Sequence, residues 1–374
     1  MDSARGVLHR VDRQRGNQMS EFHIQIVRIG KVEKHPNADS LSVTQVHGGY
    51  PVIFQTGNFK EGDLAVYLPV DAIVPDTEEW HWLAPAEKLY EDGKVKTPRP
   101  AVGEVPVSYR TIRAKKLRGI FSMGLLHPAP PGVNVGDNVQ ELLGITKYEE
   151  LPPEEGSDRA LTPKGVPVPY YDLEGLRRYL HVLQDGEEVV ITEKLNGENA
   201  RYLIDSEGQF HVGSHGQWKQ HSGKNNWSKV ATLLSLENRL RQARSEIVVY
   251  GETHGYVGGF SYGQKSPTLR IFDVYDREKQ KWWDWDDVES LSLEIGIPTV
   301  PVLFRGPWSP ELLTLAEGPS TLDPSHVREG FVVKPTVERT AVLLREDGVT
   351  IPAKSDRVIF KMIGEGFHLR KRKQ

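Results

Sequence analysis

A stretch rich in proline, glycine and acidic residues divides the chain into two parts. It occupies positions 141–169 and reads ELLGITKYEELPPEEGSDRALTPKGVPVP. Such clusters mark loops between folded elements. A chain of 374 residues is also too long for one ordinary hydrophobic core. We therefore predict a linker at 141–169 that joins a domain at 22–140 to a second domain at 170–374.

Positions 1–21 are polar and arginine-rich and lack the periodic apolar spacing of a helix or strand. A regular alternating stretch follows soon after Met19. We expect 1–21 to be a disordered extension that precedes the folded part of the chain.

The first domain has the pattern of short β-strands. Apolar and polar residues alternate over Phe22–Ile29 and Leu41–Val46, which is typical of half-buried strands. Turn residues separate the strands at 35–39, 47–49 and 60–63. The pattern predicts a small all-β barrel.

The second domain mixes both periodicities. Leu173–Leu183 has helical spacing, Glu188–Glu193 is a β-branched, apolar strand pattern, and strands alternate with helices after it. The whole chain is therefore predicted to be α+β, with a β-barrel followed by a mixed domain.

The composition is that of a folded protein in solution, with 38% hydrophobic and 26% charged residues. No apolar run is long enough to cross a bilayer, and no signal core is present, so we expect a cytoplasmic protein without membrane contact. The lack of cysteine excludes disulfides, thiolate zinc sites and cysteine nucleophiles. No histidines stand at metal-ligand spacing, so we expect no zinc site.

Positive charge is local, because the net charge is -4. One basic cluster consists of Arg113, Lys115, Lys116 and Arg118, and another occupies 370–373. Each has two interpretations at this point: a nucleic-acid contact, or a solvated face or frayed tail.

The segments HPNADSLSVTQV, TGNFKEGDLAVYLPVDAIVP and RAKKLRGIFSMGLL resemble the OB modules of tRNA-binding and ligase-associated domains. The resemblance covers Phe22–Leu126. OB modules bind nucleic acid through a basic, aromatic-bearing face, which implies that Lys115, Lys116 and Arg118 contact phosphates. The alternative is that the module is only a structural brace.

The second domain carries a series of short motifs in a fixed order. They are ITEKLNGENARY with Lys194, IVVYGE ending at Glu252, LRIFDVYD with Phe272, REGFVVKP with Glu329 and Lys334, and VIFKMI with Lys361. A Lys-x-x-Gly sequence alone carries no information, but the ordered set does.

Chemistry explains why these residue types are needed together. A lysine amine has a pKa of about 10.4, so a nucleophilic lysine needs desolvation or neighbouring cations. We expect Lys334 and Lys361 to supply those cations and to neutralise phosphate charge. The carboxylate of Glu329 suits Mg²⁺ or Mn²⁺.

The ordered motifs resemble the covalent nucleotidyltransferase superfamily of ligases and RNA-capping enzymes. The resemblance implies that Lys194 is the nucleophile, with Lys334 and Lys361 as further catalytic residues and Glu329 as a metal ligand. It also implies that Glu252 holds the ribose and Phe272 stacks on the base. The complete set of implied nucleotide-binding residues is Glu193, Leu195, Asn196, Gly197, Asn199, His215, Glu252, Phe272, Lys334 and Lys361.

Three positions depart from the superfamily pattern. Asn196 replaces an acidic residue, as is common among RNA ligases, and His215 stands where they commonly carry arginine. Ile359 stands where a second lysine is usual near Lys361, and Lys354 is a possible substitute.

Single residues also have plainer interpretations. Phe272 alone would be a core residue, and Glu252 alone a salt-bridged strand end. The tryptophans of KWWDWDD at 281–287 are expected to anchor the start of a helix more than to stack on bases.

The chain from Phe22 to Leu369 resembles RNA ligases of the Deinococcus type, which place an OB module before the nucleotidyltransferase domain. Few residues follow Lys361, so we expect no carboxyl-terminal OB domain of the kind found in DNA ligases. The resemblance implies ATP with Mg²⁺ or Mn²⁺ as cofactors. It also implies joining of 3′-OH and 5′-phosphate ends at nicks in RNA or RNA/DNA duplexes, by a monomer. The alternatives are an RNA guanylyltransferase and a non-catalytic RNA-binding protein.

Overall fold

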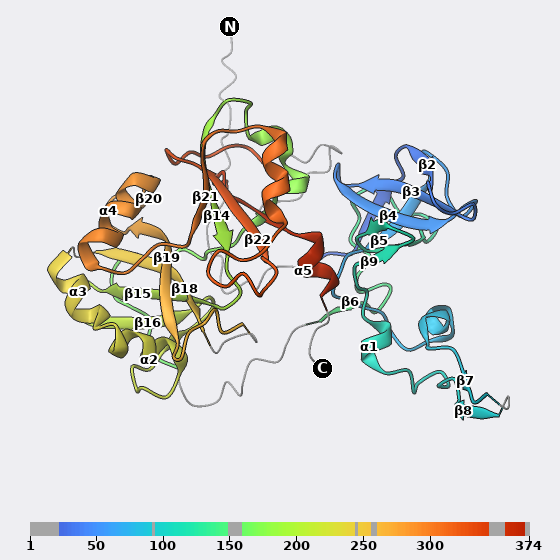
Figure 1. The fold of residues 1–374 in the computed structure, drawn as a ribbon, viewed down its shortest axis with the longest axis horizontal. Coiled ribbons are helices and arrows are strands. Elements are labelled where there is room, and N and C mark those ends of the chain that lie inside the picture. Colours follow the sequence, from blue (N-terminus) through green and yellow to red (C-terminus); the bar gives the residue numbers. More distant parts are fainter. Residues whose placement is uncertain are drawn as a thin grey trace, which may run out of the picture.

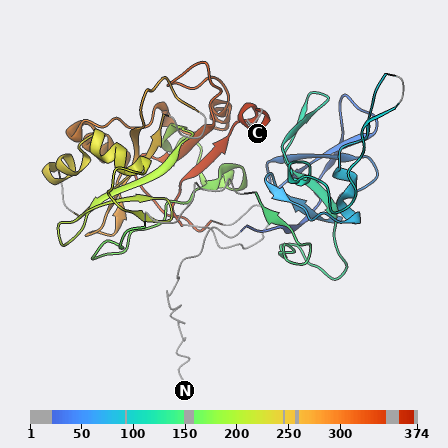
Figure 2. The ribbon, with the colours of Figure 1, turned by 90° about the horizontal axis from the view of Figure 1, so that it is seen from below.

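The computed structural model describes residues 22–91, 94–148, 159–243, 246–255, 260–343 and 356–370. The predicted extension at 1–21, Lys354 and the basic residues after Arg370 lie outside this part of the chain. Figures 1 and 2 show two bodies side by side, with the short helix α5 (Glu365–Leu369) at the boundary between them.

The amino-terminal body is built of small antiparallel sheets. Its main sheets have the strand orders β1-β5-β11 and β2-β3-β4. The strands are β1 (Gln25–Arg28), β2 (Val32–Lys34), β3 (Leu41–Val46), β4 (Tyr50–Gln55), β5 (Leu64–Leu68) and β11 (Leu125–Pro128). The three two-stranded pairs are β6 (Ala72–Ile73) with β12 (Thr146–Lys147), β7 (Lys88–Leu89) with β8 (Val95–Thr97), and β9 (Lys115–Leu117) with β10 (Ile120–Ser122). The short helices are η1 (Glu78–Leu83) and α1 (Val107–Arg110).

The central strands of this body are buried on both faces. Alternate residues of β1 enter two different hydrophobic clusters, with Ile26 in one and Val27 in the other. In β5, Val66 lies in the same cluster as Ile26, and Tyr67 lies in the same cluster as Val27. The prediction of half-buried strands is therefore wrong for the first segment, because the sheets enclose β1 from both sides. The strand predicted at Leu41–Val46 is confirmed.

The second body has two antiparallel-rich sheets that face one another across the candidate site. One sheet has the order β13-β23-β22-β14-β21 and the other β17-β16-β15-β18-β19-β20. The first contains β13 (Glu174–Gly175), β14 (Glu188–Lys194), β21 (Val302–Pro307), β22 (Gly330–Pro335) and β23 (Phe360–Ile363). The second contains β15 (Glu198–Ile204), β16 (Phe210–Ser214), β17 (Trp218–Lys219), β18 (Ile247–His254), β19 (Thr268–Asp276) and β20 (Lys281–Trp282).

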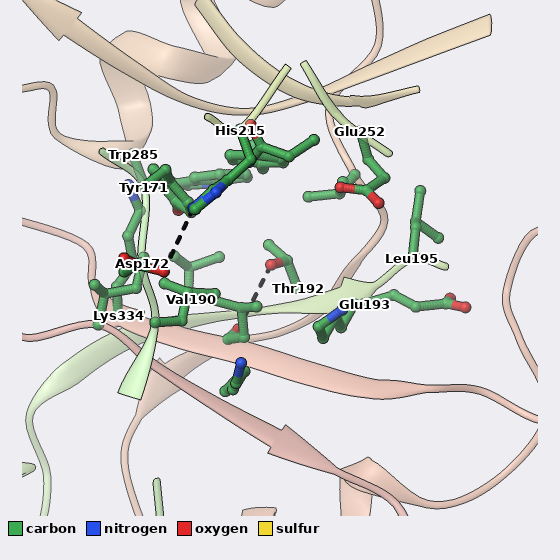
Figure 3. Close-up of a pocket in the computed structure, with 18 residues that line it drawn as sticks. Tyr171, Asp172, Val190, Thr192, Glu193, Leu195, His215, Glu252, Trp285 and Lys334 are labelled. Carbon is green, nitrogen blue, oxygen red and sulfur yellow. Dashed lines mark hydrogen bonds and ion pairs between the residues drawn. The ribbon is translucent and has the colours of Figure 1, made fainter. Parts of the chain in front are cut away.

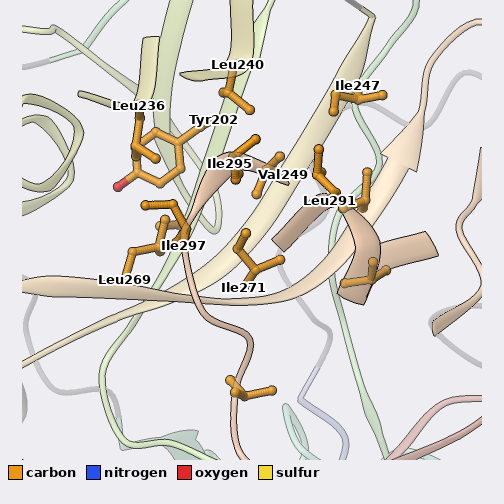
Figure 4. Close-up of a cluster of buried hydrophobic side chains, with 14 of the residues drawn as sticks. Tyr202, Leu236, Leu240, Ile247, Val249, Leu269, Ile271, Leu291, Ile295 and Ile297 are labelled. Atoms are coloured by element: carbon orange, nitrogen blue, oxygen red, sulfur yellow. The ribbon is translucent and has the colours of Figure 1, made fainter. Parts of the chain in front are cut away.

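Three helices cover the six-stranded sheet. They are α2 (Asn226–Leu233), α3 (Leu236–Ala243) and α4 (Trp285–Ile295). Leu236, Leu240 and Leu291 pack against Val249 and Ile271 of the sheet in one cluster, shown in Figure 4. Burial of so many branched side chains is the main source of stability for this layer. The predicted helix start in the tryptophan-rich segment is confirmed, because α4 begins at Trp285.

The helix predicted from the spacing of Leu173–Leu183 is wrong. The segment starts as β13, which pairs in parallel with β23. It continues as two short 3₁₀ turns, η2 (Leu176–Arg178) and η3 (Leu180–Val182). Leu176 and Tyr179 are buried under the five-stranded sheet, so tertiary packing satisfies their apolar spacing without an α-helix. The remaining 3₁₀ helix is η4 (Pro310–Ala316).

The two ends of the predicted linker are held by different bodies. Tyr148 donates its backbone N–H to Asp71 in the amino-terminal body, and Ala160 donates to Trp218 in the second. The predicted domain limits, 22–140 and 170–374, stay a prediction, since residues 149–158 lie outside the described part of the chain.

The two bodies touch through polar and aromatic contacts. Arg177 donates to the backbone oxygen of Gly49 at 3.2 Å, and the guanidinium of Arg178 lies 5.8 Å from the ring centre of Tyr50. Phe121 of β10 and His368 of α5 have ring centres 6.3 Å apart. Within the described residues, no helix is long and apolar enough to span a membrane.

Candidate active site

Lys194 is the last residue of β14, at the point where the chain leaves one sheet for the other. Strand β14 belongs to the five-stranded sheet and β15 to the six-stranded sheet. The turn between them needs Gly197, because a Cβ there would collide with the carbonyl oxygen of Thr253. Only glycine permits so close an approach of two backbones. The sequence motif therefore places Lys194 between the two sheets.

Lys194 forms an ion pair with Glu329. Its Nζ lies 2.7 Å from the Oε1 of Glu329, which precedes β22. Burial lowers the pKa of Lys194, but the charges of Glu329 and Glu252 outweigh that effect and the pKa is raised. The expectation that cations would lower this pKa is therefore wrong for this conformation.

Glu252 lies beside this pair on the neighbouring sheet. It is paired with Asn199 in the β15–β18 register. Burial raises the pKa of Glu252 to about 8, and the nearby Glu329 adds to the shift. The predicted role of Glu252, to hold the ribose hydroxyls, stays a prediction.

A cavity of about 260 Å³ opens between the sheets. Figure 3 shows His215, Tyr171 and Trp285 on one side of it and Leu195 and Glu252 on the other. The predicted residues that line it are Glu193, Lys194, Leu195, Asn199, His215, Glu252, Phe272, Lys334 and Lys361. Of the other predicted residues, Glu329 reaches the site through Lys194, and Asn196 and Gly197 form the adjoining turn. Residues that the motifs did not indicate, notably Tyr171, Asp172, Thr192 and Trp285, also line it.

Phe272 belongs to an aromatic wall of the cavity. Its ring centre lies 4.6 Å from that of Tyr171, with 42° between the ring planes. Phe272 also packs against the hydrophobic core, so it is at once a core residue and a cavity residue, and its stacking on a base stays a prediction.

His215 approaches the carboxylate of Asp172. The Nε2 of His215 lies 3.4 Å from Oδ1, a contact drawn in Figure 3. No sequence motif indicates Asp172, which directly precedes the segment whose spacing wrongly predicted a helix.

Lys334 is held in a buried charge network. Its Nζ donates to Asp273 at 3.0 Å and to Glu338 at 2.9 Å. Arg357 donates to the same two carboxylates, and Tyr171 donates to Asp273. Burial raises the pKa of Asp273, but Arg357 and Lys334 outweigh it and hold that pKa below its usual range. The charges of the two cations and two carboxylates cancel.

Residues 187–363 match the family model of RNA ligases. This domain belongs to the RNA ligase family. The match spans Lys194, Glu252, Phe272, Glu329 and Lys361, so it confirms the expected family. Residues 23–129 match an OB-fold domain.

Solved structures of the Naegleria gruberi RNA ligase have the same fold. A variant with ATP and Mn matches with a TM-score of 0.71 at 22% identity, covering 93% of this chain and 98% of that one. The enzyme with PPi matches with a TM-score of 0.68 at 22% identity, covering 92% and 96%. These matches confirm the predicted order of an OB fold followed by a ligase-type domain. No curated protein matches the sequence.

The cavity of the RNA ligase domain contains polar atoms suited to a nucleotide. Within the described residues, Oε1 of Glu193 and Oδ1 of Asn199 are buried without a hydrogen-bond partner. Buried acceptors of this kind are costly unless a ligand supplies donors, as a base amino group or ribose hydroxyl does.

The site also offers hard oxygen ligands. Glu329 and Glu252 both lie close enough to influence Lys194, although no cluster of at least three metal-binding side chains occurs in the described residues. These residues fit a Mg²⁺ or Mn²⁺ ion that takes its remaining ligands from phosphate and water.

The predicted nucleic-acid contacts lie on a hairpin of the OB fold. Lys115 and Lys116 are exposed on β9. Arg118 occupies the turn to β10 with φ 44, and it is tied to Asn37 by two hydrogen bonds. The hairpin therefore presents several positive charges at one edge of the OB fold. Phe121, on the second strand of the same hairpin, contacts α5 of the RNA ligase domain.

Proposed function

We propose that this chain is an ATP-dependent RNA ligase that joins 3′-OH and 5′-phosphate ends through a lysyl-AMP at Lys194. The observation that carries the proposal is the position of Lys194 in one cavity with Glu252, Phe272 and Lys361. Membership of the RNA ligase family and the likeness to a ligase solved with ATP and Mn support it.

The nucleoside would occupy the part of the cavity between the sheets. Phe272 offers a ring face for adenine, and Glu252 offers oxygens for the ribose hydroxyls. Asn199 and Glu193 contribute the buried acceptors that lack a partner among the described residues. This places the α-phosphate beside Lys194 and Lys361, since both lie at the cavity wall.

The resting ion pair explains how Lys194 is kept inactive. A protonated amine has no lone pair, and Glu329 stabilises the proton on Lys194. Glu329 is the carboxylate that would hold the metal, and engaging it there would release the amine. A bound divalent cation supplies charge neutralisation and polarises the phosphate.

The proposed reaction consists of three displacements. Nζ of Lys194 gives up its proton and attacks the α-phosphorus of ATP, and the bond to pyrophosphate breaks. An oxygen of the RNA 5′-phosphate then attacks the same phosphorus, which restores the lysine and caps the strand with AMP. Finally the 3′-OH loses its proton, its oxygen attacks the 5′-phosphate, and AMP leaves.

We propose nicks in RNA-containing duplexes as the substrate. The exposed cations Lys115 and Lys116 on the OB hairpin support this, since a basic edge beside the catalytic domain suits a duplex backbone. A-form RNA duplexes differ in shape from B-form DNA duplexes, and only RNA carries the ribose 2′-OH. We therefore expect that the strand with the 3′-OH end must be RNA.

Labelling tests the proposal. Purified protein is incubated with α-labelled ATP or GTP and with Mg²⁺ or Mn²⁺, and then denatured. Label from ATP that remains on the protein, and is lost in Lys194→Ala, is expected. The exposed Lys229→Ala serves as the control variant. Label from GTP alone would indicate the guanylyltransferase, and no label would indicate a non-catalytic RNA-binding protein.

Sealing is then measured on nicked duplexes that differ in one strand. An RNA 3′-OH strand should be sealed faster than its DNA equivalent. Equal sealing of an all-DNA nick would contradict the RNA assignment and leave the lysine chemistry standing.

A further inference from the structure

A second cavity in the RNA ligase domain is built around a buried arginine that has no counter-ion among the described residues. Arg201 of β15 is 3% exposed. Its guanidinium lies 4.4 Å from the ring centre of Trp218 and 5.9 Å from that of Tyr170. Among the described residues, the Nε of Arg201 has no hydrogen-bond partner, and the ionisable groups that act on its charge are Tyr250 and Tyr170, not a carboxylate.

The cavity has a volume of about 300 Å³. It forms where the carboxyl-terminal part of the predicted linker pairs with β17 at the edge of the six-stranded sheet, and Ala160 is fixed there by its hydrogen bond to Trp218. The residues that wall it beside Arg201 include Arg159, Pro163, Tyr170, Gly216 and Trp218.

An unpaired buried charge is unfavourable, and here burial lowers the pKa of Arg201. The aromatic rings offset only part of that cost, because a cation–π contact supplies no hydrogen-bond acceptors. A planar guanidinium fork is best satisfied by a phosphate or carboxylate. The second arginine at the wall, Arg159, adds positive charge, so the cavity suits an anion.

The position of Arg201 relative to Lys194 indicates that the anion in this cavity is not the reacting phosphate beside Lys194. Asn199 and Arg201 are two residues apart on β15, so they project from the same face, about 7 Å from each other. Asn199 pairs with Glu252 in the register, whereas Arg201 pairs with Tyr250. The strand thus leads away from Lys194 toward Arg201, and the reacting phosphate lies at the other end. The two cavities are nonetheless neighbours, since the ring centres of Tyr170 and His215 lie 5.9 Å apart.

We propose that the Arg201 cavity binds a backbone phosphate of the RNA strand, away from the break that is sealed. The site is distinct from the nucleotide cavity, and it would anchor the strand whose end reacts. This inference rests on the proposed function for its choice of RNA as the source of the phosphate.

RNA binding in the absence of ATP tests the site on the full-length chain. The probe is a labelled RNA duplex with a nick, titrated at several salt concentrations. Arg201→Met keeps most of the side-chain volume and removes the charge. It should weaken binding about tenfold, and reduce the slope of log affinity against log salt by about 0.7–0.9, as for one lost phosphate contact. Lys229→Met, which removes an exposed charge outside the cavity, should do neither.

A second variant avoids the risk of unfolding. A Cβ at Gly216 would meet nothing within 4 Å, so Gly216→Glu introduces a carboxylate at the cavity wall without a clash. It should weaken RNA binding in the same way, because the new carboxylate competes with phosphate for Arg201. Gly216→Gln is the uncharged control and should bind RNA more tightly than Gly216→Glu.

Unchanged RNA affinity in both Arg201→Met and Gly216→Glu would overturn the proposal. A raised KM for ATP in lysine adenylation, with RNA binding unchanged, would also overturn it, since the anion would then be the ATP tail. Failure of the proposed function would give a different result from failure of the Arg201 site. A chain that forms no lysyl-AMP but binds RNA in an Arg201-dependent way would refute ligation and support the site.

Discussion

Nζ of Lys194 lies 2.7 Å from Oε1 of Glu329, so the proposed nucleophile and the proposed metal ligand neutralise one another in this structure. The amine is consequently held in its protonated, unreactive form. Release of this contact is the event on which the proposed chemistry depends, and it leads to the first prediction.

Glu329→Gln should lower the pKa of Lys194, because Glu329 contributes more to the raised value than Glu252 does. The measurement is the rate at which an amine-specific reagent labels Lys194 in the unliganded protein near pH 8. Labelling should rise in Glu329→Gln, and rise less in Glu252→Gln. Glu329→Gln should nonetheless lose sealing activity. Unchanged labelling would show that the ion pair does not control the proton.

Lys194→Ala should form no lysyl-AMP and should not seal RNA with an unadenylated 5′-phosphate. The final displacement needs the cations and the 3′-OH but not the nucleophile, so the variant should still seal a strand that already carries AMP. Gel analysis of the two substrates separates the steps. Loss of both activities, in a variant with unchanged circular dichroism, would assign Lys194 a second role.

Glu252→Gln should stabilise the unliganded protein at alkaline pH. Its pKa is raised from 4.5 to about 8, so the folded state holds a proton that the unfolded state releases between those values. Stability from this group is therefore lost as pH rises from about 4.5 to 8. The thermal midpoint of Glu252→Gln should exceed the wild type by roughly 5–10 °C at pH 8.5, and the difference should vanish near pH 4.5. A constant difference across this range would contradict the assignment.

Phe272→Ala should raise the KM for ATP about tenfold, as expected for loss of one base-stacking ring. The variant also loses its contact with Tyr171, so a thermal midpoint is needed beside the kinetics. Phe272→Tyr retains a ring face and is the matched control. An unaltered KM in Phe272→Ala would remove this ring from the nucleotide site.

Substitution of Lys115 and Lys116 by alanine should weaken nick sealing most at low salt, because the variant has fewer phosphate contacts for salt to screen, and should spare lysine adenylation. Both side chains are exposed, so little loss of stability is expected. The same substitutions at Lys229 and Lys224, which are exposed on the other body, are the control. If the substitutions at Lys115 and Lys116 change sealing no more than the control substitutions do, the OB fold would have only a structural role.

The motifs predicted most of the cavity because each lies at a strand end or on a strand, where its neighbours are fixed by register. Lys194 and Glu252 are examples, since β14, β15 and β18 bring them together over short connections. The sequence could not reveal the partner of Lys334. Asp273 is 61 residues from Lys334 in the chain, and its motif LRIFDVYD gives no sign of an ion pair with a lysine.

The helix predicted at 173–183 shows the limit of periodicity as evidence. Leu176 and Tyr179 have helical spacing, yet they are buried by the five-stranded sheet from two short 3₁₀ turns. Arg201 was missed for a similar reason, because a single arginine in a strand gives no sign that tertiary packing will enclose it.

The turn at 195–197 has a mechanical consequence. It connects the sheet that carries Lys194 to the sheet that carries Glu252, and the ion pair of Lys334 with Asp273 at 3.0 Å ties the same two sheets at a second place. The two walls of the cavity are therefore fixed to one another at both places, so the width of the cavity is set by the fold before any ligand enters.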